Sequence, residues 1–404
     1  MRRVSLVAFF THRGIPFLLL PLWAQLTLNP HSGYGIGFPH LPAPSSHMGM
    51  GRLSTVGAAT NLPEQPAHSA HLPAMQTDFS GYARTSVLSS PAQRAQGGVG
   101  GLQNLQLSFA RGKGWGFALG LTPQAIQGYL SSQQLSQPTP VRYTEKSDGI
   151  LSLAYMQLAF RWRQLALGYQ LGYLWGNYDR ERSLQGTTQT LPDYLLSQVR
   201  LAGLQHRVGL LWQDSIQTAI YQVSVCYALP TSLHQEVLYR LQKNFSLTNL
   251  LLDTLALVHR KWRYFSPWRA GAYVATERWA VGAEGGYSPP ADTWEGPGLT
   301  YAQATSSWDV RIGVEWVPDP RSPIFYRRLR YQGGGFLTHP PYATALRWYG
   351  LTGGVGWQFP RSPNFVYLSI ERGWLPHPVV AERYFQVSIG MVFRELWFIP
   401  PRID

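Results

Sequence analysis

The chain has 404 residues, of which 14% are charged and 13% aromatic, and its formal net charge is +13. Charge is scarcer than the roughly 25% of soluble domains, and no run reaches the roughly 18 apolar residues of a membrane-spanning helix, so the alternating strands of a membrane β-barrel fit better. The basic residues are scattered, which argues against nucleic-acid binding and favours contact with the anionic phosphates of outer-membrane lipids.

The first 24 residues have the order of a secretory signal. Arginines at positions 2, 3 and 13 precede an apolar run at 15–23, and Ala24 offers a small-residue cleavage site. A buried helix is the alternative, but Pro16 and Pro21 interrupt the run. The single cysteine, Cys226, excludes an intramolecular disulfide framework and lies too far from Ala24 to be a lipid-anchored N-terminus.

Residues 25–76 are rich in proline, glycine, serine and histidine and show little periodicity. Such a composition predicts irregular backbone, and a soluble domain rarely begins with so long an unpatterned segment. We therefore expect an N-terminal hatch, or plug, folded inside the barrel. His68 and His71 suggest a metal by their spacing, but no carboxylate or thiolate completes a recognisable site, so we interpret them as polar plug residues and predict no metal.

From residue 77 to 404, segments with a period of two follow one another. The clearest spans 308–316, where tryptophans at both ends and aliphatic residues alternate with Asp309, Arg311, Gly313 and Glu315. An arginine facing lipid at mid-bilayer would cost roughly 2–4 kcal/mol, so this segregation predicts apolar side chains toward lipid and charges toward the lumen. Trp308 and Trp316 are about 26 Å apart along a strand, close to the spacing of two aromatic girdles once tilt is included.

Short turns alternate with long connections along this region. The alternation predicts about 14 strands, with both ends on the periplasmic side, if 229–263 forms one extracellular excursion rather than an additional spanning strand. Gln213–Asp214 is one of the expected short turns. The predicted fold is all-β: a transmembrane antiparallel β-barrel with the plug in its lumen. A soluble all-β domain is the structural alternative, and it would be extracted without detergent.

Several short motifs together resemble the FadL type of long-chain fatty acid transporter, in particular a divergent outer-membrane branch. They span nearly the whole mature chain and lie at 32–37, 46–49, 61–74, 101–105, 115–116, 267–273 and 387–398. The resemblance implies a 14-strand barrel plugged by an N-terminal hatch that carries an Asn-Pro-Ala turn. Gln65 stands here where the family has asparagine, followed by Pro66 and Ala67.

The resemblance also implies capture of a hydrophobic molecule by the outer loops and its passage through the barrel. A set of aliphatic loop residues recurs at helical spacing and fits such a capture surface, and packing against neighbouring loops is the other interpretation. The set is Leu247, Leu250, Leu251, Leu255 and Val258.

Charges on the inward faces predict a lumen of mixed sign. They are Arg269, Glu284, Asp309, Arg311, Glu315, Arg328, Arg330 and Glu371. One interpretation is that they pair with one another and with the plug. The other is that some bind a carboxylate head group, for which the arginine fork is well shaped. Arg311, Arg328 and Arg330 are the candidates, since we expect them on adjacent strands.

The resulting hypothesis is a passive channel for hydrophobic or amphiphilic, fatty-acid-like molecules in the outer membrane of a Gram-negative cell. The alternative is a non-transporting barrel that serves as a component or anchor of a secretion or surface-attachment assembly. A continuous apolar tunnel past the plug favours transport, whereas a sealed lumen with large ordered external loops favours the partner role. No Gly-x-Ser-x-Gly elbow, phosphate loop or zinc signature is present, so we predict neither catalysis nor a cofactor.

Overall fold

The computed structural model describes residues 37–57, 60–91, 94–111, 114–135, 141–186, 192–244, 250–264, 267–290, 305–340, 347–359, 362–377 and 380–395. The expected signal sequence at 1–24 lies outside these residues. Within them, no helix is long and apolar enough to cross a membrane.

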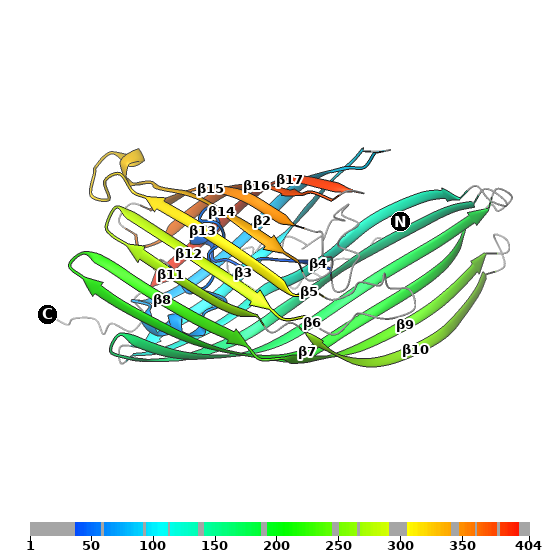
Figure 1. Cartoon of the computed structure of the whole chain (residues 1–404), viewed down its shortest axis with the longest axis horizontal. Coiled ribbons are helices and arrows are strands. Elements are labelled where there is room, and N and C mark those ends of the chain that lie inside the picture. Colours follow the sequence, from blue (N-terminus) through cyan, green and yellow to red (C-terminus); the bar gives the residue numbers. More distant parts are fainter. Residues whose placement is uncertain are drawn as a thin grey trace, which may run out of the picture.

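A closed ring of fourteen antiparallel strands forms the wall (Figure 1). β2 to β8 pair in sequence, β8 pairs with β11, and β11 to β17 pair in sequence. β17 pairs with β2 over fifteen residues, which closes the ring and confirms the predicted strand number. The strands are β2 Met75–Ser89, β3 Arg94–Arg111, β4 Trp115–Leu135, β5 Val141–Trp162, β6 Leu165–Gly186, β7 Asp193–Ile216, β8 Ala219–Ala228, β11 Trp268–Ala275, β12 Trp279–Ser288, β13 Ser307–Trp316, β14 Arg330–His339, β15 Trp348–Gln358, β16 Phe365–Leu375 and β17 Ala381–Glu395.

Two further strands, β9 (Thr231–Asn244) and β10 (Leu250–Tyr264), form a hairpin between β8 and β11. β9 pairs with residues 194–202 of β7, whereas β8 pairs with residues 207–216 of the same strand. The hairpin therefore stands above β8 and adds no strand to the ring. The leucines of this region recur at helical spacing in the sequence, but residues 250–264 form a strand and not a helix.

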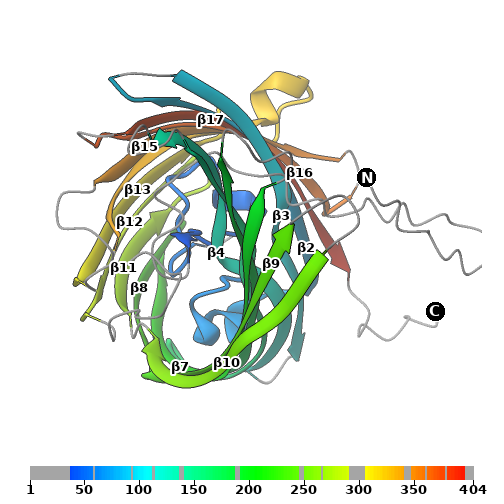
Figure 2. The same ribbon diagram turned by 90° about the vertical axis from the view of Figure 1, so that its right-hand side faces the viewer.

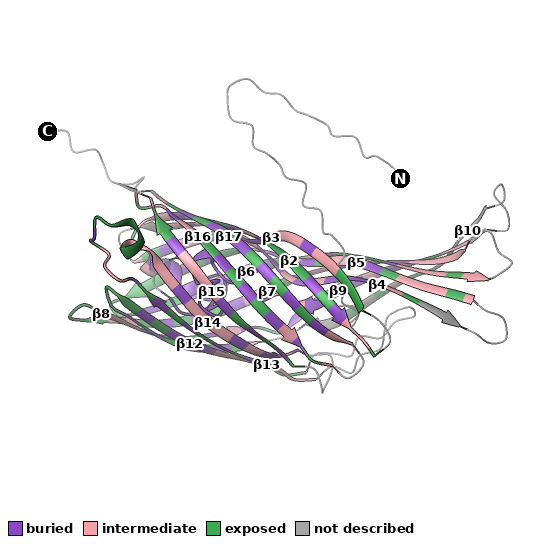
Figure 3. Cartoon of the chain, turned by 90° about the horizontal axis from the view of Figure 1, so that it is seen from above, coloured by how far each residue is buried: buried purple, intermediate pink, exposed green. Residues whose placement is uncertain are grey.

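The two faces of the wall segregate as the alternation predicts. Ile312, Ile389 and Phe393 point outward with exposures of 58%, 51% and 43%, whereas Arg311 and Glu315 point inward with 0% and 7%. Figure 3 shows the same alternation of exposed and buried residues along the strands. A wall that is apolar outside and polar inside requires hydrocarbon around it, which is the arrangement of outer-membrane barrels.

Strand length differs sharply around the ring. β4 to β7 have 21 to 24 residues, whereas β11, β12 and β13 have 8 to 10. The long strands continue past the rim together with β9 and β10 as a curved sheet (Figures 1 and 3), which we call the extension. Its inner face carries a buried apolar cluster that includes Leu151, Leu174 and Val199.

Short turns join the strands at the opposite end, as at Arg163–Gln164. In outer-membrane barrels the short turns face the periplasm and the long connections face outward, so we assign the extension to the extracellular side. The turn expected at Gln213–Asp214 lies four residues later, because β7 continues to Ile216 and Gln217 takes the positive φ of 55° that the turn needs.

An ion-pair cluster stiffens the extension. Glu145 of β5 pairs with Arg180 and, at 3.1 Å, with Arg182, both on β6, and accepts a hydrogen bond from Tyr143 at 3.1 Å. Burial alone would raise the pKa of Glu145, but the two guanidinium groups outweigh burial and hold the pKa below its usual value. The stabilisation is therefore present above the unfolded carboxyl pKa of about 4.3 and is lost as the pH falls through the lower folded pKa.

Replacement E145Q should loosen the extension and leave the barrel folded. Loss of charge-assisted hydrogen bonds costs about 1.5–3 kcal/mol, so protease should cleave E145Q within β4 to β6 faster than wild type at neutral pH. In acid the wild-type protein loses the same bonds, and the two cleavage rates should converge. Glu181, on the other face of the same strands, has no ion pair among the described residues, and E181Q is the matched control. Equal cleavage of E145Q and E181Q would contradict the assignment.

Candidate functional site

The N-terminal residues 37–57 and 60–74, which we call the luminal segment, lie inside the ring (Figure 2). The segment enters beside β4, where β1 (Phe38–Pro39) pairs with Ala125 and Ile126. It then forms two short 3-10 helices, η2 (Ser45–His47) and η3 (Pro66–His71). From residue 41 to 57 every side chain is buried, so the wall encloses the segment.

The turn that begins η3 is capped by Gln65, at the position where the resembled family has asparagine. The Gln65 side chain accepts a hydrogen bond from the Ala67 backbone nitrogen at 3.3 Å and caps the helix, and Pro66 occupies the first helical position. The same side chain donates to the carbonyls of Leu210 and Val225 at 3.1 and 3.3 Å. The additional methylene of glutamine thus lets the cap also reach the wall.

Glycines of the wall receive the backbone of the luminal segment. A Cβ atom at Gly168 would fall closer than 3.0 Å to the backbone of Pro66 and Ala67, and one at Gly313 would meet the Met50 carbonyl equally closely. Gly116 and Gly334 make the same approach to Ser69 and Gly51. No larger residue fits these four positions unless the segment shifts, so the inward glycines fix its path.

A buried ion network joins the segment to the opposite wall. Arg311 of β13 lies 3.0 Å from a carboxylate oxygen of Glu284 and 3.0 Å from one of Asp309. Its guanidinium also donates to the Arg52 carbonyl at 2.8 Å and to the Ser54 hydroxyl at 3.0 Å. One wall arginine therefore bonds to both wall carboxylates and luminal backbone.

The acidic members of this network bind the segment as well. Glu284 accepts hydrogen bonds from the backbone nitrogens of Ser54 and Thr55 at 2.9 and 2.8 Å. Glu64 belongs to the luminal segment itself and pairs with two arginines of the wall, Arg269 at 3.0 Å and Arg207 at 3.4 Å. Since every charge has an opposite partner within the network, burial is compensated, and the segment is bonded to the stretch of wall from β7 to β13.

A second contact lies three strands farther along the wall from β13. Arg52 of the luminal segment pairs with Glu371 of β16 at 2.5 Å, and Glu371 also accepts a hydrogen bond from the Tyr384 hydroxyl at 2.6 Å. Nearer the periplasmic end, Gln332 donates to the Ser46 carbonyl at 2.6 Å. Polar contacts thus follow the segment along most of its length.

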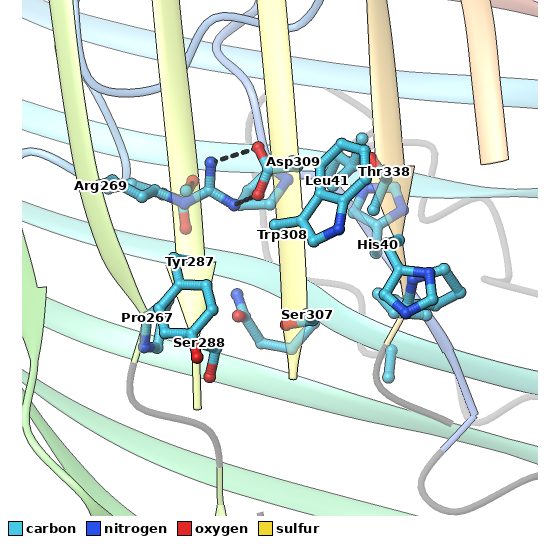
Figure 4. A pocket seen from close by; sticks show the side chains of 18 of the residues that line it. His40, Leu41, Pro267, Arg269, Tyr287, Ser288, Ser307, Trp308, Asp309 and Thr338 are labelled. Atoms are coloured by element: carbon cyan, nitrogen blue, oxygen red, sulfur yellow. Dashed lines mark hydrogen bonds and ion pairs between the residues drawn. The ribbon is translucent and has the colours of Figure 1, made fainter. Parts of the chain in front are cut away.

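A small pocket remains between the segment and the extracellular ends of β11 to β14 (Figure 4). Its volume is about 110 Å³, and His40, Leu41 and Thr338 line one side. Arg269 lines another side and makes two hydrogen bonds of 2.8 Å to Asp309, drawn as dashed lines in Figure 4. The lining of the pocket therefore includes members of the ion network.

The structure separates the three arginines that we considered for carboxylate binding. Arg311 is enclosed by the network, and Arg330 pairs with Glu315 at 2.6 Å near the periplasmic end. Arg328 lies in η4 (Phe325–Arg328), in the connection between β13 and β14, and not on a neighbouring strand. The interpretation that inward charges pair with one another and with the luminal segment is confirmed for Arg269, Glu284, Asp309, Arg311 and Glu371.

The aliphatic loop residues are placed only in part. Leu247 lies outside the described residues, and Leu250, Leu251 and Leu255 lie on β10 with side chains outside the described set. Val258 packs against the apolar cluster of the extension. Capture of a hydrophobic molecule by these leucines stays a prediction.

The luminal histidines take part in packing and hydrogen bonding. His68 is buried, and its Nε2 lies 2.7 Å from the Gly57 carbonyl oxygen. Among the described residues, no group of three or more histidine, cysteine, aspartate or glutamate side chains is placed to hold a metal ion.

The closed ring, its lipid-facing apolar surface and its filled lumen define a β-barrel protein with the fold of outer-membrane channels. Solved structures of this fold include the CymD monoaromatic hydrocarbon channel, at 15% identity and a TM-score of 0.58, with 89% of this chain and 99% of that chain covered. The P. putida toluene transporter TodX aligns at 14% identity and a TM-score of 0.57, with the same two coverages.

The chain belongs to the BamG family, whose family model matches residues 12–404. A search of curated protein sequences finds no match. The fold expected from the FadL-type resemblance agrees with the channels above, and membership of a divergent FadL branch stays a prediction.

Proposed function

We propose that this protein is a plugged outer-membrane barrel that serves as a structural component of a surface or secretion assembly and presents its extension to partner proteins. The observation that carries the proposal is the filled lumen: the luminal segment contacts wall glycines through its backbone and is bonded to both sides of the ring, to Arg207 of β7 and to Glu371 of β16. A passage would need to break buried ion pairs, each costly to separate. The luminal segment then acts as a permanent plug.

The extension offers a surface for a partner. Its outer face has a hollow of about 590 Å³ at the junction of β6, β7, β9 and β10. Tyr173 and Trp175 stack at its lower edge with ring centroids 6.1 Å apart, and polar residues form the rest. Aromatic side chains and arginine are enriched at protein interfaces. The polar residues include Asn177, Arg200, His234, Glu236, His259 and Lys261.

Passive transport of hydrophobic or amphiphilic small molecules is the second candidate. It is supported by the shared fold with barrels named as hydrocarbon channels and by the apolar cluster on the inner face of the extension. The luminal pocket of about 110 Å³ could hold a small molecule. In this candidate function the plug moves aside for each molecule that passes.

Deletion of the hairpin separates the two functions. The Ala228 backbone nitrogen donates to the Pro267 carbonyl at 3.1 Å, so the two ends of the excursion are adjacent and a short turn can replace residues 231–264. We expect the wild-type protein to migrate in gently solubilised membranes as a complex heavier than the monomer. The deleted protein should migrate as a folded monomer, because the partner surface is gone.

Reconstituted protein supplies the second readout. Liposomes that contain wild-type protein should take up toluene and fatty acid no faster than empty liposomes. A monomeric wild-type protein with rapid uptake would overturn the assembly role in favour of the channel. The double variant R200A/K261A, which alters the hollow and keeps the hairpin, should weaken the complex without affecting barrel folding.

A further inference from the structure

Charged side chains also occur on the outward face of the wall, and two arginines share one patch of it. Arg372 of β16 and Arg383 of β17 point outward from the wall and are exposed. Both lie toward the extracellular ends of their strands, next to the connection that joins β16 to β17. Lipid-facing arginine is costly at mid-bilayer, and the cost falls to near zero only at the interface.

Aromatic residues place the two arginines at that interface. Arg383 lies directly across the β16–β17 pair from Trp374, and Arg372 precedes the same tryptophan by two residues on the same face. Trp374 stacks on Tyr349 of β15 at 5.6 Å between ring centroids. Tryptophan and tyrosine of this kind form the girdle at the level of the lipid headgroups.

The side chain of Arg372 extends toward the headgroups. Its guanidinium carbon lies 5.4 Å from the centroid of the Trp374 ring, which is within cation–π range. Phe385 and Leu351, its partners on the neighbouring strands, are apolar and exposed. The aliphatic stem of Arg372 therefore lies among lipid-facing side chains while its charge is directed to the rim, as in snorkelling.

No carboxylate neutralises this pair among the described residues. The acidic neighbours in sequence, Glu371 and Glu382, point inward with exposures of 5% and 2% and pair with Arg52 and Arg84. The outward partners of Arg383 are Trp374 and Val87, and neither carries a charge. Two positive charges thus face the headgroup layer without an acidic partner among the described residues.

We propose that Arg372 and Arg383 bind the phosphate of an anionic lipid in the outer leaflet, with Trp374 and Tyr349 packed against the lipid beneath its phosphate. Two guanidinium forks on one face match the several acceptor oxygens of a phosphate group. The lipid would fill the space between the strand rim and the surrounding leaflet. This site is independent of the plug and of the hairpin, so it does not depend on the proposed assembly role.

Lipid binding to detergent-solubilised protein, followed by native mass spectrometry, tests the site. Wild-type protein is compared with R372Q/R383Q, with the charge-conserving R372K/R383K, and with R142Q/R327Q as a control. Arg142 and Arg327 are exposed and lie on β5 above the girdle and in η4 at the other end. The control therefore removes the same two charges elsewhere.

We expect R372Q/R383Q to bind lipid A or phosphatidylglycerol about tenfold more weakly than wild type, as loss of charge-assisted hydrogen bonds implies. R372K/R383K should be intermediate, R142Q/R327Q unchanged, and zwitterionic phosphatidylcholine should bind all four proteins alike. Loss of lipid A alone or phosphatidylglycerol alone would support the site and identify its lipid. Equal binding of both anionic lipids to wild type and R372Q/R383Q, or their complete displacement by millimolar inorganic phosphate, would overturn it. Unchanged circular dichroism of R372Q/R383Q verifies that the barrel is folded.

Discussion

Replacement R311A should release the luminal segment from the wall and make the closed barrel conduct ions. Arg311 has no exposed surface, and its removal leaves the carboxylates of Glu284 and Asp309 buried without part of the positive charge that neutralises them. Breaking a buried pair by removal of one partner typically costs about 3–5 kcal/mol. The bonds to the Arg52 carbonyl and the Ser54 hydroxyl are lost in the same step. Planar-bilayer conductance and protease cleavage within residues 41–57 measure the release.

Arg321 provides the control for this experiment. It pairs with Glu277 at 2.9 Å in the periplasmic turns, where the two side chains are 85% and 50% exposed. A solvated pair of this kind contributes about 0–1 kcal/mol, so R321A should remain closed and resistant to protease. If R311A is as closed as R321A, the network does not hold the segment and the plug assignment fails.

The wall could be predicted from the sequence because each strand alone carries the pattern. In 308–316 the alternation of tryptophan and aliphatic residues with Asp309, Arg311 and Glu315 indicates which face meets lipid, whatever the neighbouring strands are. The identity of neighbours followed from the alternation of short and long connections. The exact turn after β7 was misplaced, since Gln213 and Asp214 resemble turn residues but remain within the strand.

The interior could be predicted only as a composition. Irregular backbone has no period, so the sequence did not reveal that Glu64 and Arg52 of the luminal segment reach opposite walls, at Arg207 of β7 and Glu371 of β16. The small residues at 116 and 168 were visible as one face of their strands, but their meaning appears only when η3 is placed against them. Likewise, Arg372 and Arg383 belong to different strands, and only the β16–β17 register brings them around one tryptophan.

Replacement G168A should displace η3 although it adds a single methyl group. The new Cβ would lie closer than 3.0 Å to the backbone of Pro66 and Ala67. A side chain at that position could rotate away, but backbone in a capped turn can move only with the whole turn. Overpacking of this type costs about 1–3 kcal/mol or more. The shift would also break the Gln65 bonds to the Leu210 and Val225 carbonyls. We expect a lower unfolding temperature and conductance bursts as the turn leaves the wall.

Two further variants locate the cause of the effect. A Cβ at Gly353 would meet nothing closer than the Gln332 carbonyl oxygen at 3.8 Å, an ordinary van der Waals contact, so G353A should match wild type in both measurements. The double variant G168A/A67G should retain the defect, since the clash is with backbone atoms that glycine also has. Rescue by A67G would mean that the methyl groups of two alanines collide and that the backbone of η3 stands farther from β6 than the structure places it. Because Gly116, Gly313 and Gly334 also approach luminal backbone, retention of the defect would identify backbone-to-wall packing, together with the ion network, as what keeps the barrel closed.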